Sequence, residues 1–284
     1  MYKKCILPIF LCFLLTTCHP FSQNRLAAVK KWFILLDYKA SLYPAGEKEL
    51  LRYDMAILDP DNHPEIDKAK GKTILIAYVS IGEAEDYRAY WEEIKGAEWV
   101  IDENPDWKGN YYVDVRSSDW QNTIMGKVIP AAIEKGFDGI FMDTIDTSSV
   151  LESRDPERFK GSDEAMANFV KEIHKRYPGI LIISNNGFSV LEEIAPVLSG
   201  MLTEDIYMMP DFENDGYKEV PAGDRAYKVA ILKKLMEKYK IPVFLIDYVS
   251  QDDKPLIKQC IKDNKRLGFK PYIAEKGLDR IYEN

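Results

Sequence analysis

Cysteine is scarce in this chain of 284 residues, and it is unevenly placed. Of the four cysteines, Cys5, Cys12 and Cys18 fall within the first 18 residues, and only Cys260 follows them. An internal disulfide or a zinc site built from thiolates is therefore excluded for residues 19–284. Cys260 lies in a helical pattern, where a lone cysteine is expected to be a small core residue.

Histidine and basic charge are also in short supply. None of the three histidines follows an expected strand, which argues against a zinc or iron site made of imidazoles. There are 38 Lys+Arg against 46 Asp+Glu, a net charge of -8 that repels phosphate backbones, so no nucleic-acid partner is expected. The sequence has neither a Gly-x-Ser-x-Gly turn nor a phosphate-binding loop. With no cofactor or metal expected, acid–base chemistry by carboxylates is what remains.

Long hydrophobic runs are missing beyond the first residues. Residues 6–15 are apolar and follow Lys3 and Lys4, which is the pattern of an export signal, and the run is too short to span a bilayer as a mature helix. Leu15-Thr16-Thr17-Cys18 resembles a bacterial lipobox, although Gly, Ala or Ser is usual in place of Thr17. We predict a signal peptide over residues 1–18, either of the lipoprotein type with Cys18 lipidated or of the ordinary type, with an uncleaved anchor as the main alternative. Residues 19–30 are expected to be a tether, and the protein to be exported: membrane-anchored, periplasmic or extracellular.

The remaining residues, 31–284, alternate short β-rich runs with longer amphipathic ones. Most short runs are continuously apolar, as are strands covered on both faces. The alternation predicts an α/β fold, a single (β/α)8 TIM barrel. A doubly wound open sheet is the alternative, but residues 38–41 lack its glycine-rich turn. Strands are expected at 32–36, 55–58, 73–79, 111–115, 139–142, 180–184, 201–203 and 242–246. The main helices are expected at 122–135, 163–177, 224–239 and 254–267, with shorter ones at 47–52, 65–70, 87–95 and 190–197, and the tail 270–284 adds a strand or covers the barrel.

Polar side chains gather where these strands end. The carboxyl ends of the strands build the site in a (β/α)8 barrel. Each such residue alone is equally well explained as a helix cap or a turn residue. Together they predict a mouth crowded with carboxylates, amides and tyrosines, which are groups that cleave glycosidic bonds and hold sugars. The residues are Asp37, Tyr38, Asp59, Asp61, Tyr78, Ser80, Glu83, Glu85, Asp86, Asp114, Asp143, Asp146, Asn185, Asn186, Glu204, Asp205, Asp247 and Tyr248.

Two long motifs carry a resemblance to a known family. Residues 78–88 read Tyr-Val-Ser-Ile-Gly-Glu-Ala-Glu-Asp-Tyr-Arg and residues 136–146 read Gly-Phe-Asp-Gly-Ile-Phe-Met-Asp-Thr-Ile-Asp. With residues 185–187 and 203–205, they resemble glycoside hydrolase family 114, the endo-alpha-1,4-polygalactosaminidase family. Some relatives carry the label cysteinyl-tRNA-synthetase-like, which the acidic composition and the lack of zinc ligands do not support.

The resemblance implies a (β/α)8 barrel that hydrolyses alpha-1,4-linked galactosamine polymers. The family's catalytic Asp, at the fifth strand end, falls on Asp143, and its catalytic Glu, at the seventh, falls on Glu204.

The favoured hypothesis is therefore a monomeric glycosidase that acts on an amino-sugar polysaccharide. Asp143 is expected to be the nucleophile and Glu204 the general acid/base of a retaining mechanism. A carbohydrate-binding lipoprotein with the same barrel is one alternative, and a hydrolase whose carboxylates hold Mg²⁺ or Ca²⁺ is another. Substrate contacts are expected from Asp37, Glu83 and Asp146, which would bind protonated amines, and from Tyr38, Tyr78, Ser80, Asn185, Asn186, Asp247 and Tyr248.

Overall fold

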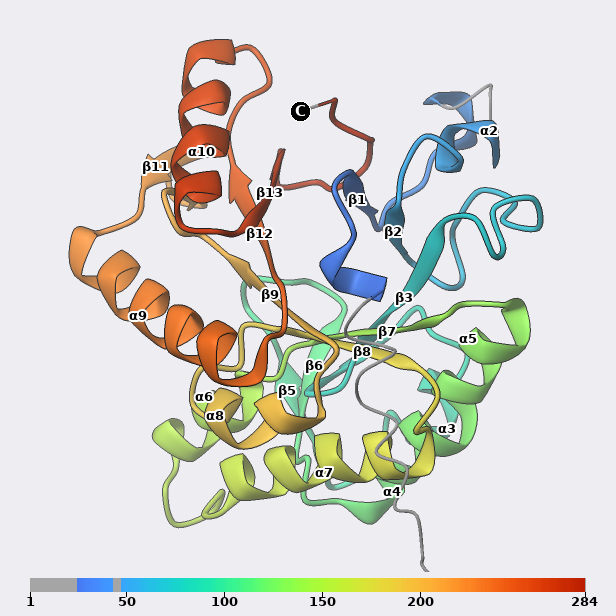
Figure 1. The fold of residues 1–284 in the computed structure, drawn as a ribbon. Helices are drawn as coiled ribbons and strands as arrows, with labels where there is room; N and C mark the ends of the chain where they lie inside the picture. Colours follow the sequence, from blue (N-terminus) through green and yellow to red (C-terminus); the bar gives the residue numbers. More distant parts are fainter. Residues whose placement is uncertain (1–24, 43–46, 284) are drawn as a thin grey trace, which may run out of the picture.

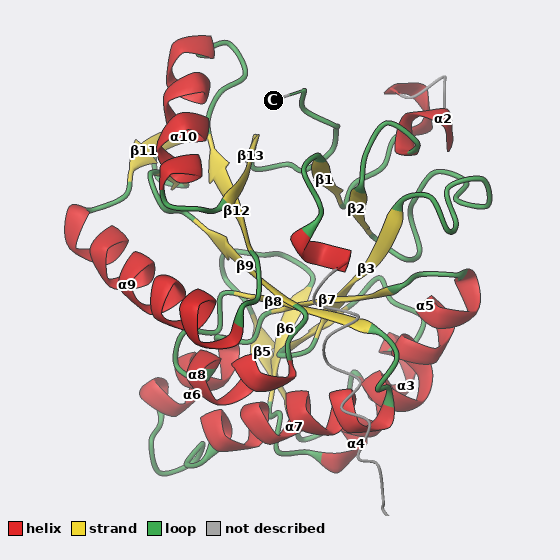
Figure 2. Ribbon diagram, viewed as in Figure 1, coloured by secondary structure: helices red, strands yellow, loops and turns green. Residues whose placement is uncertain are grey.

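The computed structural model describes residues 25–42 and 47–283, so the predicted signal peptide, Cys18 and half of the tether lie outside the described residues. Eight strands form one parallel sheet, and Figures 1 and 2 show helices around the outside of it. Trp32 donates from Nε1 to the carbonyl of Lys270 at 3.2 Å and so joins the two edges of the sheet in a nearly closed barrel. The predicted TIM barrel is confirmed. In sheet order the strands are β1 (Trp32–Leu35), β2 (Met55–Leu58), β3 (Ile74–Ser80), β7 (Gly139–Asp143), β8 (Leu181–Asn185), β9 (Gly200–Glu204), β12 (Val243–Tyr248) and β13 (Lys270–Ala274).

The barrel strands are buried on both faces. All four residues of β1 and all six of β12 are buried. Because successive side chains of a strand point to opposite faces of the sheet, both faces of these strands are covered. One face fills the barrel and the other packs under the helices, so continuous apolar runs are the sequence pattern that this architecture requires.

The four long helices predicted from the sequence are present. The segment expected at 122–135 is longer, and consists of α4 (Ser118–Thr123), a π-helical turn η2 (Ile124–Val128) and α5 (Ile129–Lys135). Gly136 ends α5 in the left-handed region, at φ 100°, as a helix stop should. The helix expected at 65–70 is wrong, because this segment forms turns. The other helical segments are η1 (Ala40–Leu42), α2 (Glu47–Leu50), α3 (Trp91–Ile94), α6 (Thr147–Arg154), α7 (Ser162–Arg176), α8 (Leu191–Ile194), η3 (Ala195–Val197), α9 (Ala222–Tyr239) and α10 (Lys254–Arg266).

One expected barrel strand is wrong. Residues 111–115 belong mostly to β6 (Asn110–Val113), which pairs antiparallel with β4 (Glu83–Glu85) and β5 (Val100–Glu103) in a separate three-stranded sheet. Three of the four β6 residues are only partly buried, unlike those of the barrel strands. The eighth barrel strand is β13, supplied by the tail. Asp143 therefore ends the fourth barrel strand rather than the fifth, and Glu204 the sixth rather than the seventh.

Two insertions follow barrel strands at the end where a barrel site is built. The three-stranded sheet lies between β3 and β7 in the sequence. After β9, the strands β10 (Met208–Asp211) and β11 (Gly216–Glu219) form an antiparallel hairpin. Of the helices within residues 25–42 and 47–283, none is long and apolar enough to cross a membrane.

Candidate active site

A cavity of about 510 Å³ lies at the carboxyl ends of the barrel strands, within the usual size range of small-molecule sites. Side chains from six barrel strands and from the three-stranded sheet line it. Within the described part of the chain, no group of three or more His, Cys, Asp or Glu is arranged to hold a metal ion. The predicted site residues that line the cavity are Tyr78, Glu83, Asp143, Asp146, Asn185, Asn186, Glu204 and Tyr248.

Asn185 stands between the two predicted catalytic carboxylates. Its Nδ2 donates to Oδ1 of Asp143 at 2.8 Å and to Oε1 of Glu204 at 2.8 Å. These two oxygens are therefore no more than about 5.6 Å apart, twice that distance. The outer oxygen of each carboxylate accepts from a tyrosine: Tyr78 donates to Asp143 Oδ2 at 3.0 Å, and Tyr248 donates to Glu204 Oε2 at 2.8 Å. The centre of the site is thus one hydrogen-bonded row that crosses five neighbouring barrel strands from β3 to β12.

The residue after each of the three central side chains has a left-handed backbone. The φ angle is 61° at Thr144, 45° at Asn186 and 60° at Asp205. This conformation costs a non-glycine residue on the order of 1 kcal/mol or more, and a β-branched threonine adopts it rarely. The Thr144 hydroxyl accepts from the backbone N–H of Gly82 at 2.8 Å, which holds that turn in place. Such strain concentrates at functional sites, and here it turns the chain away directly after each side chain that faces the cavity.

Burial and charge set the protonation of Glu204. Burial raises its pKa, and the neighbouring charge of Asp143 adds to the rise. The donors Tyr248 and Asn185 and the charge of Lys228 act in the opposite direction, and the net pKa stays raised. A carboxyl group with a raised pKa close to a second carboxylate is the arrangement that acid–base catalysis by two carboxylates needs.

Two buried acceptors in the cavity are left without a partner among the described residues. Glu83 is only 4% exposed, and its Oε1 accepts from Asn104 Nδ2 at 3.1 Å and from the Thr147 hydroxyl at 2.9 Å. Its Oε2 has no hydrogen-bond partner, and neither has Oδ1 of Asn185. Burial raises the pKa of Glu83. An unpaired buried acceptor is costly, and both of these atoms belong to residues that line the cavity.

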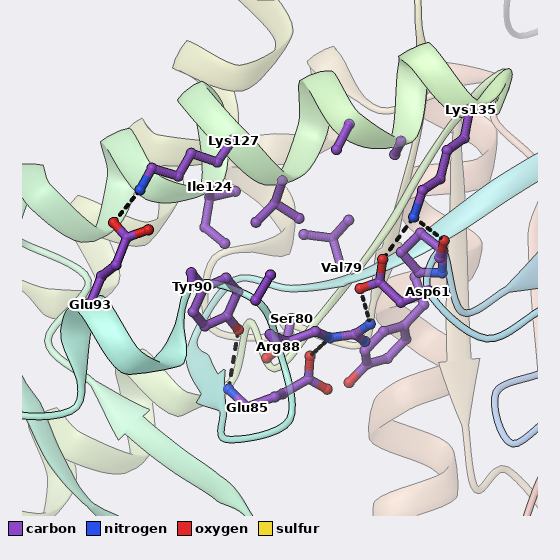
Figure 3. A pocket seen from close by; sticks show the side chains of 16 residues that line it. Asp61, Val79, Ser80, Glu85, Arg88, Tyr90, Glu93, Ile124, Lys127 and Lys135 are labelled. Carbon is purple, nitrogen blue, oxygen red and sulfur yellow. Dashed lines mark hydrogen bonds and ion pairs between the residues drawn. The ribbon is translucent and has the colours of Figure 1, made fainter.

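Arg88 supports the wall of the cavity from behind. It binds Asp59 through two parallel hydrogen bonds, at 2.9 and 2.8 Å, and Glu85 through Nε at 2.7 Å. Its guanidinium lies over the ring of Tyr78, with 5.9 Å to the ring centroid, and Figure 3 shows it extending between Glu85 and Asp61. This buried charge cluster therefore fixes the ring whose hydroxyl holds Asp143.

A second cavity, of about 220 Å³, lies on the far side of that wall, between β3 and the helical segment from α4 to α5 (Figure 3). Val79 and Ile124 are among its apolar walls, and Lys127 at its edge forms an ion pair with Glu93. Its walls are mainly apolar, so the chemistry that the described residues offer lies in the first cavity.

Comparison with known proteins identifies the family. Residues 18–284 match the sequence profile of glycoside-hydrolase family GH114. The chain belongs to family GH114. An uncharacterised protein of Deinococcus radiodurans is 28% identical to this GH114 chain over 93% of it and 86% of the relative. A second uncharacterised relative, from Thermotoga maritima, is 31% identical over 72% of the GH114 chain and 66% of the relative.

Solved structures share the fold of this GH114 chain. The glycoside hydrolase domain of PelA from Pseudomonas aeruginosa superposes with a TM-score of 0.74 at 23% identity, covering 89% of this chain and 97% of that domain. Ega3 of Aspergillus fumigatus, in complex with galactosamine, superposes with a TM-score of 0.66 at 15% identity, covering 89% and 94%. At these identities the likeness concerns the barrel fold.

One residue of the GH114 chain that we expected to bind substrate supports the structure of a loop instead. Asp247 is fully buried, and its Oδ1 accepts from the backbone N–H groups of Ile206, Tyr207 and Met208 at 2.8 to 3.2 Å. Its Oδ2 accepts from Asn264 of α10 at 2.6 Å. Asp247 therefore holds the loop that follows Glu204, in place of the substrate contact that we expected.

Three further predicted residues also lie outside the lining of the cavity. The Ser80 hydroxyl donates to the Glu83 carbonyl at 2.8 Å and supports that turn. Asp37 is half-exposed and forms an ion pair with Lys39 at 3.0 Å. Tyr38 is likewise not part of the lining, and a substrate contact by these three residues stays a prediction.

Other residues that line the GH114 site were not predicted from the sequence. Asn104 and Trp107 come from the turn between β5 and β6, and Lys276 follows β13. These positions are not the ends of expected strands. An aromatic residue in the polar turn 104–109 was the one available signal. Thr147 directly follows the motif at residues 136–146, and extending that motif by one residue would have included it.

Proposed function

We propose that this chain hydrolyses alpha-1,4-linked, galactosamine-type polysaccharide by a retaining mechanism, with Asp143 as nucleophile and Glu204 as general acid/base. The observation that carries the proposal is the single Asn185 nitrogen that binds both carboxylates. This shared hydrogen-bond donor supports two carboxylates that act on the same glycosidic bond, since both lie beside one small volume of the cavity.

The separation of the carboxylates favours retention. Double displacement places the two groups about 5–5.5 Å apart, whereas inversion needs about 6.5–9.5 Å to admit a water. The facing oxygens of Asp143 and Glu204 are within about 5.6 Å of each other, which is compatible with the close approach that double displacement needs. The nucleophile therefore attacks the anomeric carbon directly, and water enters only after the leaving group has departed.

The environments of the two carboxylates divide their roles. Glu204 has a raised pKa and can hold the proton that the leaving oxygen takes up. Asp143 and Glu204 each accept two hydrogen bonds, from a tyrosine and from Asn185, so the raised pKa of Glu204 is what assigns it the acid role and leaves Asp143 as the nucleophile. After the glycosyl–enzyme ester forms, Glu204 as a carboxylate takes a proton from the incoming water.

The charge of the cavity favours an amino sugar. Its lining carries Glu83, Asp143, Asp146 and Glu204, and its cation Lys276 is already paired with Asp215. A protonated amine gains charge attraction as well as hydrogen bonds from the free oxygen of Glu83. PelA and Ega3 share the fold, and Ega3 was solved with galactosamine, which supports the same class of substrate here.

The proposal also includes export of the enzyme to where such polysaccharides occur. The basic and apolar residues of the first 18 positions fit a signal peptide, and Cys18 is the residue at which a lipid would be attached. Membrane contact would then occur only through that lipid.

The test is incubation of the mature protein with partly deacetylated galactosamine and glucosamine polymers, followed by mass analysis of the products. Shortened galactosamine chains whose new ends appear first as the alpha anomer by proton NMR are expected. Asp143→Asn and Glu204→Gln are the controls. Binding without cleavage would indicate a carbohydrate-binding protein instead, and loss of activity with a chelator would indicate a metal-dependent hydrolase.

A further inference from the structure

Two exposed aromatic side chains from different insertions meet at the rim of the cavity. Trp107 belongs to the turn between β5 and β6, and Phe212 follows β10 at the tip of the β10–β11 hairpin. They are 51% and 55% exposed, yet their rings contact each other edge to face, with 5.9 Å between centroids and 82° between planes. Large apolar side chains left in water at the mouth of a polar cavity indicate a surface that a ligand covers.

Hydrogen bonds connect the turn that carries Trp107 to the interior of the cavity. Its backbone N–H donates to the carbonyl of Asn104 at 3.2 Å, and its carbonyl accepts from Asn110 at 3.0 Å. The side chain of Asn104 in turn donates to Glu83 at 3.1 Å. The turn is thus bonded to a carboxylate that lines the cavity, so the position of the indole is fixed relative to the site.

Phe212 reaches the same place from the opposite side. The hairpin that carries it is tied to the segment after β13 by an ion pair between Asp215 and Lys276. Lys276 and Trp107 both line the cavity. The hairpin therefore contacts two residues of the cavity lining, Lys276 through Asp215 and the indole of Trp107 through Phe212.

We propose that Trp107 and Phe212 form a subsite that stacks against a sugar ring of the polymer outside the point of cleavage. The inference rests on the proposed polysaccharide substrate and goes beyond it, because it assigns a binding role to two residues away from the carboxylates. The carbon-bound face of a pyranose ring is apolar, whereas its hydroxyls and amine project at the edge. It fits an indole face whose neighbouring walls are acidic. Phe212 packs edge to face against the indole, so the two rings together offer one apolar surface to a bound chain.

The test compares Trp107→Ala and Phe212→Ala with wild type on galactosamine oligomers of increasing length. Trp107→Ala is expected to lower kcat/KM about tenfold on long chains, with a smaller loss as the oligomer shortens, and Phe212→Ala to follow the same trend. Trp107→Phe, which keeps an aromatic face, should recover most of the loss. Tyr227→Ala is the matched control, because Tyr227 is an exposed aromatic residue that does not line the cavity, and its effect should not vary with length.

A loss that is equal at every length, or no loss on long chains, would overturn the subsite. Affinity is measured separately, in the Asp143→Asn background, by isothermal titration calorimetry with oligomers, a readout that does not depend on the Trp107 indole. If wild type cleaves no galactosamine polymer, the proposed function fails. If cleavage occurs but affinity is unchanged in the Trp107 and Phe212 variants, only the subsite fails.

Discussion

Replacing Tyr248 by phenylalanine tests the assignment of Glu204 as the general acid. The Tyr248 hydroxyl donates to Glu204 Oε2 at 2.8 Å, and this bond favours the ionised carboxylate. A hydrogen bond to a charged group contributes about 1.5–3 kcal/mol, and about 1.4 kcal/mol corresponds to one pKa unit. Removing the hydroxyl should therefore raise the pKa of Glu204 by about one to two units.

The pH dependence of kcat/KM reports this change. A general acid must be protonated, so the alkaline limb of the profile follows its pKa. In Tyr248→Phe that limb should move to higher pH by about one unit or more, measured between about pH 4 and 9 on a soluble oligomer. The fold of the variant is checked by circular dichroism.

Tyr78→Phe is the matched control, since it removes the corresponding hydroxyl from Asp143. It leaves the hydrogen bond from Tyr248 to Glu204 intact, so the alkaline limb should stay in place. If the alkaline limb of Tyr248→Phe stays in place or moves to lower pH, Glu204 does not supply the proton.

Three further predictions follow from other parts of the molecule. Burial, with the charge of Glu204, raises the pKa of Asp205 to about 8. The stability that the protonated Asp205 contributes is therefore complete in acid and is lost as pH rises from about 4 through about 8. In Asp205→Asn, the free energy of unfolding measured by urea titration should change less with pH over that window. Asp247→Ala leaves three backbone N–H groups unsatisfied and should lower the free energy of unfolding by about 3 kcal/mol or more, with no such effect from the exposed Asp252→Ala. In cells that express the full-length gene, Cys18→Ser should abolish labelling by palmitate, and label that persists would place any lipid elsewhere.

The barrel could be predicted because its strands are buried on both faces and therefore read as continuous apolar runs. The error at residues 111–115 has the same origin, since Tyr111, Tyr112 and Val113 carry strand propensity wherever they pair. Strand propensity depends on the residues of the segment itself, whereas the sheet that a strand joins depends on whether both of its faces are buried. The barrel strand at β13 begins with Lys270 and Pro271, which weakened its signal.

The candidate site was predicted unevenly for a geometric reason. Neighbouring residues of a strand point to opposite faces, so position at a strand end does not say which side chain faces the cavity. Tyr248 reaches Glu204, while its neighbour Asp247 points away and holds a loop. The choice of Asp143 and Glu204 among many acids came from the family motifs. The wall made by Asn104 and Trp107 could not be found from strand ends, because it belongs to an insertion.

The bridging amide of Asn185 limits how catalytic competence can be judged from sequence alone. Asn185→Asp exchanges one NH₂ group for an oxygen and keeps the size of the side chain. It nevertheless removes the donor that both carboxylates share and places a third acid within contact distance of them. Like charges this close compete for protons, so the nucleophile and the acid would no longer titrate in the required order. A substitution score that treats the two residues as near-equivalents would accept such a chain as an active relative, whereas electrostatics predicts an inert one.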